Sequence, residues 1–78
     1  MKPIRFSRSA RKHRIGRVHA DHVISYGTYA VETDPVTGNP ALIVEGNDDR
    51  GVELRIVIIE HETYFLVIHV QPAYRRRT

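Results

Sequence analysis

Two strand-like segments near the C-terminus constrain the fold of this 78-residue chain more than any other feature. Residues 52–60 and 64–71 are rich in Val, Ile and aromatic side chains, and only three residues separate them. Such side chains favour β-strands, and so short a connection joins neighbouring strands in antiparallel order. We therefore expect a β-hairpin at the centre of one small domain that comprises residues 1–78.

A three-residue loop at 61–63 predicts which side chains face each other across this hairpin. The pairs on one face would be Ile58 with Leu66, Ile56 with Ile68 and Leu54 with Val70. Arg55 would then lie opposite His69 on the other face, and a slip of one residue would turn both toward the core. That second face begins apolar and becomes polar toward the C-terminus. Its apolar half predicts a partner protein or a homodimer.

The rest of the chain predicts three more strands and two short helices. The strands are expected at residues 2–6, 29–33 and 41–46, with a turn-rich segment at 34–40. The first helix would begin near Ser7 or Ser9, pass through His13 and end at Gly16. The second would span about residues 19–26 and end at Gly27. The predicted fold is α+β, with a short N-terminal strand and two short helices packed on an antiparallel meander.

Charge is distributed very unevenly along the chain, although the formal net charge is only +3. Residues 1–20 carry seven basic and no acidic side chains, residues 21–74 carry nine acidic and two basic ones, and three arginines follow. Basic clusters of this kind attract phosphates or an acidic protein, the alternative being a solvated face without function. The candidate RNA-binding residues are Arg5, Arg8, Arg11, Lys12, Arg14 and Arg76.

Several protein classes are excluded by what the sequence lacks. It has no cysteine, no apolar run near the ~20 residues that span a bilayer and no apolar stretch of a secretory signal, so we expect a cytoplasmic protein without membrane contact. Nucleotide-loop, zincin and hydrolase-elbow motifs are absent. His19 and His22 have a spacing that could bring two imidazoles to one metal ion, but no carboxylate or thiolate is expected to complete the coordination sphere. Neither a metal site nor a cofactor is expected.

The polar half of the second hairpin face is the best candidate for chemistry. Arg55 and His69 are predicted neighbours there, and Tyr74 and Arg75 follow just after the last strand. Arginine can hold a phosphate, histidine can transfer a proton near neutral pH, and tyrosine can stack on a base. A metal-independent ribonuclease would use these groups. The alternative is a solvated sheet face with a basic tail.

The predicted order of elements and three segments resemble the RelE/ParE superfamily of bacterial toxins, in a BrnT-like or related small branch. The segments are Ile-Arg-Phe-Ser-Arg-Ser-Ala-Arg-Lys-His at residues 4–13, Asp-Arg-Gly-Val-Glu-Leu-Arg-Ile-Val at 49–57 and Leu-Val-Ile-His-Val-Gln-Pro at 66–72. The resemblance implies a strand, two short helices and a meander, which agrees with the pattern above.

The same resemblance implies the toxin component of a toxin–antitoxin system, an endoribonuclease that cleaves messenger RNA at the ribosome without a metal. Arg55, His69, Tyr74 and Arg75 are the positions that match the catalytic groups of such toxins. A cognate antitoxin, acidic and amphipathic, would be the protein partner. Three alternatives remain open: action on gyrase instead of RNA, a non-catalytic basic module that binds nucleic acid or an acidic protein, and an inactive family member.

Overall fold

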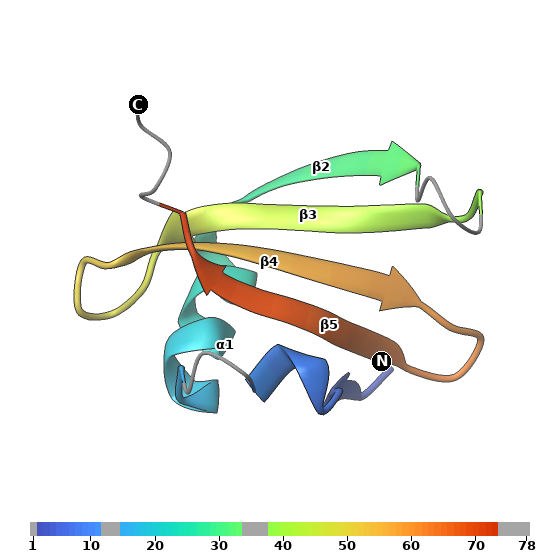
Figure 1. The fold of residues 1–78 in the computed structure, drawn as a ribbon, viewed down its shortest axis with the longest axis horizontal. Coiled ribbons are helices and arrows are strands. Elements are labelled where there is room, and N and C mark those ends of the chain that lie inside the picture. The colour runs from blue at the N-terminus through green and yellow to red at the C-terminus, as the bar shows by residue number, and fades with distance from the viewer. Residues whose placement is uncertain (1, 12–14, 34–37, 74–78) are drawn as a thin grey trace.

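Within residues 2–11, 15–33 and 38–73, which the computed structural model describes, five strands form one sheet (Figure 1). In chain order the elements are β1 (Ile4–Phe6), the 3-10 turn η1 (Ser9–Arg11), α1 (Arg17–Tyr26), β2 (Thr28–Thr33), β3 (Pro40–Asn47), β4 (Glu53–Glu60) and β5 (Phe65–Pro72). The fold is therefore α+β, as predicted.

The strands lie in the order β1-β5-β4-β3-β2. From β2 to β5 each strand pairs antiparallel with the next one in sequence, which confirms the predicted meander. β1 pairs parallel with β5, so the sheet is mixed. A parallel pair needs a long crossover, and here η1, α1 and the whole meander lie between the two strands.

The prediction of two short helices is not confirmed. In the described residues the first helix is reduced to η1, which Ser7 caps by accepting a hydrogen bond from the Ala10 amide at 3.2 Å. His13, expected inside that helix, lies outside the described residues. The sequence predicts that Gly16 ends the first helix, but its backbone is extended (φ −61°, ψ 147°) and it is the N-cap residue of α1.

Gly27 ends α1 as predicted, and the tight packing of the backbone there explains why a glycine is needed. A Cβ atom at this position would lie 2.7 Å from the carbonyl oxygen of Val23 and 2.8 Å from that of Glu45. Its Cα in turn would lie 3.1 Å from a Cβ placed on Gly46. The two glycines let the end of α1 approach β3 closely, so β2 can begin at the next residue.

The core lies on one face of the sheet, where α1 and η1 cover it (Figure 1). Its fully buried larger side chains are Val23, Val44, Leu54, Ile56, Val67 and Val70. Alternate residues of a strand point to opposite faces, so the intervening side chains of β3 and β4 point away from the helix. We call that second side of the sheet the open face.

The hairpin between β4 and β5 corrects the predicted register. Its loop comprises four residues rather than three, because Glu60 pairs with Phe65 and the amide of His61 donates to the carbonyl oxygen of Tyr64 at 2.8 Å. All expected pairs shift as a result. The observed pairs are Ile58 with Val67, Ile56 with Val70 and Leu54 with Pro72.

A β-bulge in β5 causes a second shift of one residue. Val67 pairs with Ile58 but His69 pairs with Val57, so Ile68 has no partner of its own in β4. One extra residue in a strand leaves its side chain on the same face as that of its neighbour. Ile68, predicted in the core, therefore lies with His69 on the open face, and Val67 takes its place in the core.

Candidate functional site

The open face contains a shallow hollow of about 250 Å³ over the middle strands. Its floor is apolar and its rim is polar. The lining residues are Glu32, Thr33, Ala41, Ile43, Arg55, Val57, Ile59, Ile68 and His69. Ala41 and Ile43 on its floor are each only 6% exposed, although among the described residues the helix lies on the other side of the sheet.

Arg55 of β4 lies between two glutamates on this face. Its Nη1 is 3.6 Å from Oε2 of Glu45, the residue directly opposite on β3, and its Nη2 is 3.7 Å from Oε1 of Glu32 on β2. Both distances are those of ion pairs rather than of short hydrogen bonds, and all three side chains are partly exposed. The two carboxylates hold the guanidinium over the hollow and leave it in contact with solvent.

His69 of β5 lies on the other side of Arg55. Its direct partner across the strands is Val57, and the partner of Arg55 is Gln71, which corrects the predicted Arg55–His69 pair. The two side chains are instead diagonal neighbours with Cβ atoms about 7 Å apart, a distance that long side chains span. Both line the same hollow, so the structure does bring them together on the side of the sheet away from α1.

Sequence reasoning missed the two glutamates beside Arg55. Glu32 follows Val31 and Glu45 follows Val44, and a charged residue next to an apolar one in a strand indicates an outward-facing position. That pattern alone says nothing about which other outward-facing residue they meet. Only the pairing of β3 with both β2 and β4 places the two carboxylates at one guanidinium.

The other two predicted catalytic residues, Tyr74 and Arg75, lie outside the described residues. The last described residue, Ala73, donates its amide hydrogen to the carbonyl oxygen of Glu53 at 3.0 Å. This bond continues the pairing of β5 with β4 past Pro72. Ala73 thus lies at the end of β4 that is nearer to Arg55 than the β4–β5 loop is.

The predicted RNA-binding residues that the structure describes follow the β1 edge. Arg5 of β1 pairs with Leu66 and stacks its guanidinium on the ring of Tyr64, 4.8 Å from the ring centre. Arg8 is exposed just before η1, and Arg11 donates a long hydrogen bond of 3.5 Å to the carbonyl oxygen of Phe6. The remaining three, Lys12, Arg14 and Arg76, lie outside the described residues.

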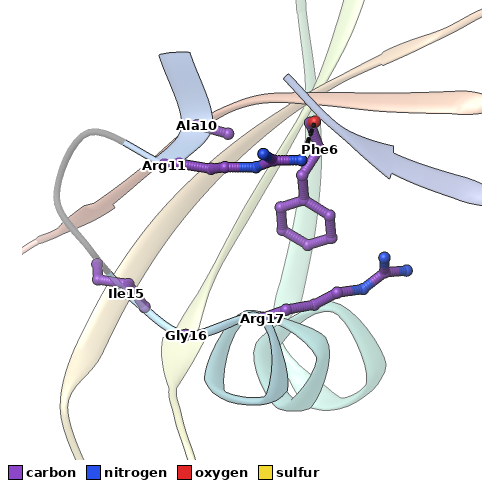
Figure 2. Close-up of a pocket in the computed structure, with 6 residues that line it drawn as sticks. All are labelled: Phe6, Ala10, Arg11, Ile15, Gly16 and Arg17. Carbon is purple, nitrogen blue, oxygen red and sulfur yellow. Dashed lines mark hydrogen bonds between the residues drawn. The ribbon is translucent and has the colours of Figure 1, made fainter. Parts of the chain in front are cut away.

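A second pocket, of about 440 Å³, lies on the helix side of the sheet between η1 and the start of α1. Figure 2 shows the ring of Phe6 between the side chains of Arg11 and Arg17. The Arg17 guanidinium is 4.8 Å from the ring centre and donates to the carbonyl oxygen of Ile4 at 3.1 Å. An aromatic ring with two guanidinium groups beside it, one stacked on the ring and one at its backbone carbonyl, suits a ligand that combines negative charge with an apolar part.

The turn between β3 and β4 depends on one buried carboxylate. Asp48 is 4% exposed and accepts hydrogen bonds from the amides of Arg50 and Val52 and from the Arg50 guanidinium. Burial alone would raise the pKa of Asp48, but these hydrogen bonds and the positive charge of Arg50 outweigh it and lower that pKa to about 2. Asp48 therefore stays ionised and stabilises the turn.

His19, Asp48 and Asp49 have ligand-type atoms within 4.8 Å of one another, a grouping that the spacing of His19 and His22 did not predict. Each carboxylate oxygen of Asp48 already accepts two hydrogen bonds, and two of the four come from the positively charged guanidinium of Arg50. His19 Nδ1 lies 2.5 Å from Oδ1 of Asp49, and this hydrogen bond lowers the pKa of Asp49. We interpret the cluster as a network that joins α1 to the turn.

Comparison of the chain with protein-family models, with curated proteins and with solved structures found no match. The described residues form one α-helix, α1, and its ten residues are too few to cross a membrane.

Proposed function

We propose that this protein is the toxin component of a bacterial toxin–antitoxin system, of the RelE/ParE type, and that it cleaves messenger RNA without a metal. The observation that carries the proposal is the order of three side chains across the open face. Glu45, Arg55 and His69 come from the adjacent strands β3, β4 and β5, with the cation in the middle. A carboxylate, a guanidinium and an imidazole in this order match the requirements of one reaction.

That reaction is the attack of an RNA 2′-hydroxyl group on the neighbouring phosphorus. A base removes the 2′-hydroxyl proton, a bond forms between the 2′-oxygen and phosphorus, and the bond from phosphorus to the 5′-oxygen breaks. An acid donates a proton to the departing 5′-oxygen, which leaves a 2′,3′-cyclic phosphate and a 5′-hydroxyl group. The phosphate gains negative charge in the transition state, and a cation stabilises it there.

The side chains of the open face can be assigned to these steps. Glu45 would be the base, His69 the acid and Arg55 the phosphate clamp, with Arg75 as a second cation and Tyr74 stacked on a base. Strands about 4.8 Å apart put the Cα atoms of Glu45 and His69 about 12 Å from each other. Two extended side chains can then reach a phosphate group from opposite sides.

The cations along β1 support an RNA strand as the ligand. Arg5 lies on the open face, because its parallel partner Leu66 does, and Arg8 is exposed two residues after the strand ends. Guanidinium groups at this edge can neutralise phosphates of a single strand. The RNA would run from this edge toward Arg55.

A second candidate function, binding of an acidic protein without catalysis, is favoured by the pocket around Phe6. That pocket faces the helix side of the sheet, away from Arg55 and His69. An acidic, amphipathic segment such as an antitoxin tail would place carboxylates at Arg11 and Arg17 and an apolar side chain against Phe6. Within a toxin–antitoxin pair the two functions are compatible.

Expression in bacteria tests the catalytic proposal. Induction of the wild-type protein should arrest growth and shorten transcripts, with cyclic phosphate at the new 3′ ends. The variants His69→Ala, Arg55→Ala and Glu45→Gln should each lower the cleavage rate of the purified protein by about 100- to 10,000-fold. An RNA with a deoxyribose at the cleaved position should stay intact, because it lacks the attacking hydroxyl.

Two matched variants control for general damage. His22→Ala removes an imidazole from α1, on the other side of the sheet, and Glu62→Gln removes an exposed carboxylate from the β4–β5 loop. Both should cleave RNA at the wild-type rate. Normal growth and intact transcripts at verified expression of the wild-type chain would exclude the ribonuclease and leave the binding function.

A further inference from the structure

The two edges of the sheet differ in how well they are protected against pairing with another strand. β1 has three residues, follows Pro3 and carries Arg5 at its centre. Short length, proline and positive charge are the usual features that keep an edge strand from pairing. β2 has six residues, Thr-Tyr-Ala-Val-Glu-Thr, without Pro, Gly, Lys or Arg, and all six are exposed.

The exposed side chains of β2 are also unusually apolar on one face. Val31 is 68% exposed and Tyr29 is 47% exposed, and both point to the side of the sheet on which α1 lies. Among the described residues α1 packs mainly over β3 and β4, and the Tyr29 hydroxyl donates a hydrogen bond to the carbonyl oxygen of Ile24 at 2.6 Å. Much of the apolar face of β2, Val31 above all, therefore stays exposed.

We propose that a second copy of this chain pairs with β2, antiparallel and centred on Ala30, so that two sheets join into one of ten strands. In this register Tyr29 lies opposite Val31 of the partner subunit, and the same pair occurs again across the two-fold axis. Aromatic side chains opposite β-branched ones are favourable pairs across antiparallel strands. In this pairing each exposed apolar side chain of β2 gains an apolar neighbour from the partner subunit.

The charges of β2 fit a second copy as well. Its one charged residue, Glu32, lies opposite Thr28 of the partner subunit, so the two negative charges do not meet. The strand is thus complementary to itself in both shape and charge. A register centred on Val31 would instead give Tyr29 only a threonine as its neighbour and is less favourable.

The expected dimer is weak, because the contact is limited to one strand pair. Stable interfaces bury about 1,200–2,000 Å² in total, and pairing five residues of each edge buries less than that. We therefore expect a dissociation constant of about 1 µM or higher. The two copies would have their open faces on the same side, which would join the two candidate RNA sites into one continuous surface.

Sedimentation of two matched variants tests the proposal independently of any catalytic activity. Val31 on β2 and Val18 on α1 are 68% and 66% exposed, so a lysine at either position should leave the fold intact. The wild-type chain and Val18→Lys should dimerise with the same affinity. Val31→Lys should weaken dimerisation at least about tenfold, because lysine on an edge strand opposes pairing.

Disulfide cross-linking tests the register, since the chain has no cysteine of its own. Ala30→Cys should form a cross-linked dimer under mild oxidation, because residues directly opposite each other have Cβ atoms close enough for a disulfide. Val18→Cys should dimerise without forming the disulfide, because position 18 lies on α1, outside the β2 contact. A wild-type chain that is monomeric at several hundred micromolar, or a dimer that Val31→Lys leaves unchanged, would overturn the proposal. More efficient cross-linking through Val31→Cys than through Ala30→Cys would overturn the register.

Discussion

Arg55 has the surroundings of a side chain that can exchange one set of anions for another. Its ion pairs with Glu32 and Glu45 are longer than 3.5 Å and partly exposed. Pairs of this kind contribute about 0–1 kcal/mol each, since solvent screens them. A phosphate that accepts two parallel hydrogen bonds from the guanidinium can therefore replace them.

Asp48 is the residue whose ionisation most affects stability. Its pKa is about 2 in the folded chain and near 3.8 without these contacts, so the folded state favours the ionised form. That preference contributes about 2 kcal/mol at pH values above 4, and the contribution is lost as the pH falls from about 4 to 2. Because the folded-state pKa is lowered, acid must destabilise the protein.

Urea unfolding at a series of pH values checks this expectation. The free energy of unfolding of the wild-type chain should fall between pH 5 and pH 2, and Asp48→Asn should be less stable at pH 6 by about 1–3 kcal/mol. The difference between the two proteins should shrink as the pH approaches 2. Asp21→Asn, which alters an exposed carboxylate on α1, is the control and should keep the wild-type pH profile.

At the scale of the elements, β5 decides which side chains form the core and which form the site. Its bulge turns Val67 and Val70 toward α1 and leaves Ile68 and His69 side by side on the open face. In a regular strand the side chains would alternate between the two faces, so Val67 and Val70 would lie on opposite faces, and so would Ile68 and His69. The extra residue therefore supplies the hollow with an apolar floor and a histidine at its rim.

The same substitution at two valines checks this arrangement. Val67→Ala should lower the free energy of unfolding by about 2 kcal/mol, because it removes two buried methyl groups and leaves a cavity. Val57→Ala, on the open face of the neighbouring strand, should lower it by less than about 1 kcal/mol. Equal losses would mean that the two faces of the hairpin are equally buried and that the assigned register is incorrect.

For the whole molecule, the position of the cations relative to the sheet determines how RNA would bind. In sequence the basic side chains gather on β1, between β1 and α1 and at the start of α1, and most acidic side chains follow from β2 onward. A polyanion is attracted to the first region and repelled from the second, so its direction across the open face is set before contact. The ion-paired Arg55 lies at the end of this path.

The salt dependence of RNA binding measures how many phosphates are neutralised. If three phosphates are neutralised, the affinity for single-stranded RNA should fall about 20-fold between 50 and 200 mM salt. Arg5→Gln and Arg8→Gln should each weaken binding and reduce the slope of log K against log salt by about 0.7. Val18→Lys, which adds a cation to an exposed surface of α1, should leave the slope unchanged. Affinity that does not depend on salt would exclude the β1 edge as the RNA-binding surface.

The local elements could be predicted from the sequence because their causes are local. The concentration of Val, Ile and other large apolar residues predicts β3, β4 and β5, and Gly27 predicts the end of α1. The position of Arg55 on the face away from the helix follows from the apolar residues on either side of it, Leu54 and Ile56, since a guanidinium in the core would lose its hydration. The first helix was not predictable in this way, because Gly16 can either end or begin a helix.

Only the tertiary structure decided which of these residues meet. The β4–β5 loop and the bulge each contain one residue more than predicted, so Arg55 and His69 are diagonal neighbours and not a direct pair. Both extra residues depend on small differences in local backbone energy that composition does not reveal. The approach of Glu32 and Glu45 to Arg55 requires three strands in register. Such contacts join residues far apart in the chain, so they are determined by the packing of the whole sheet against α1 and not by any single segment.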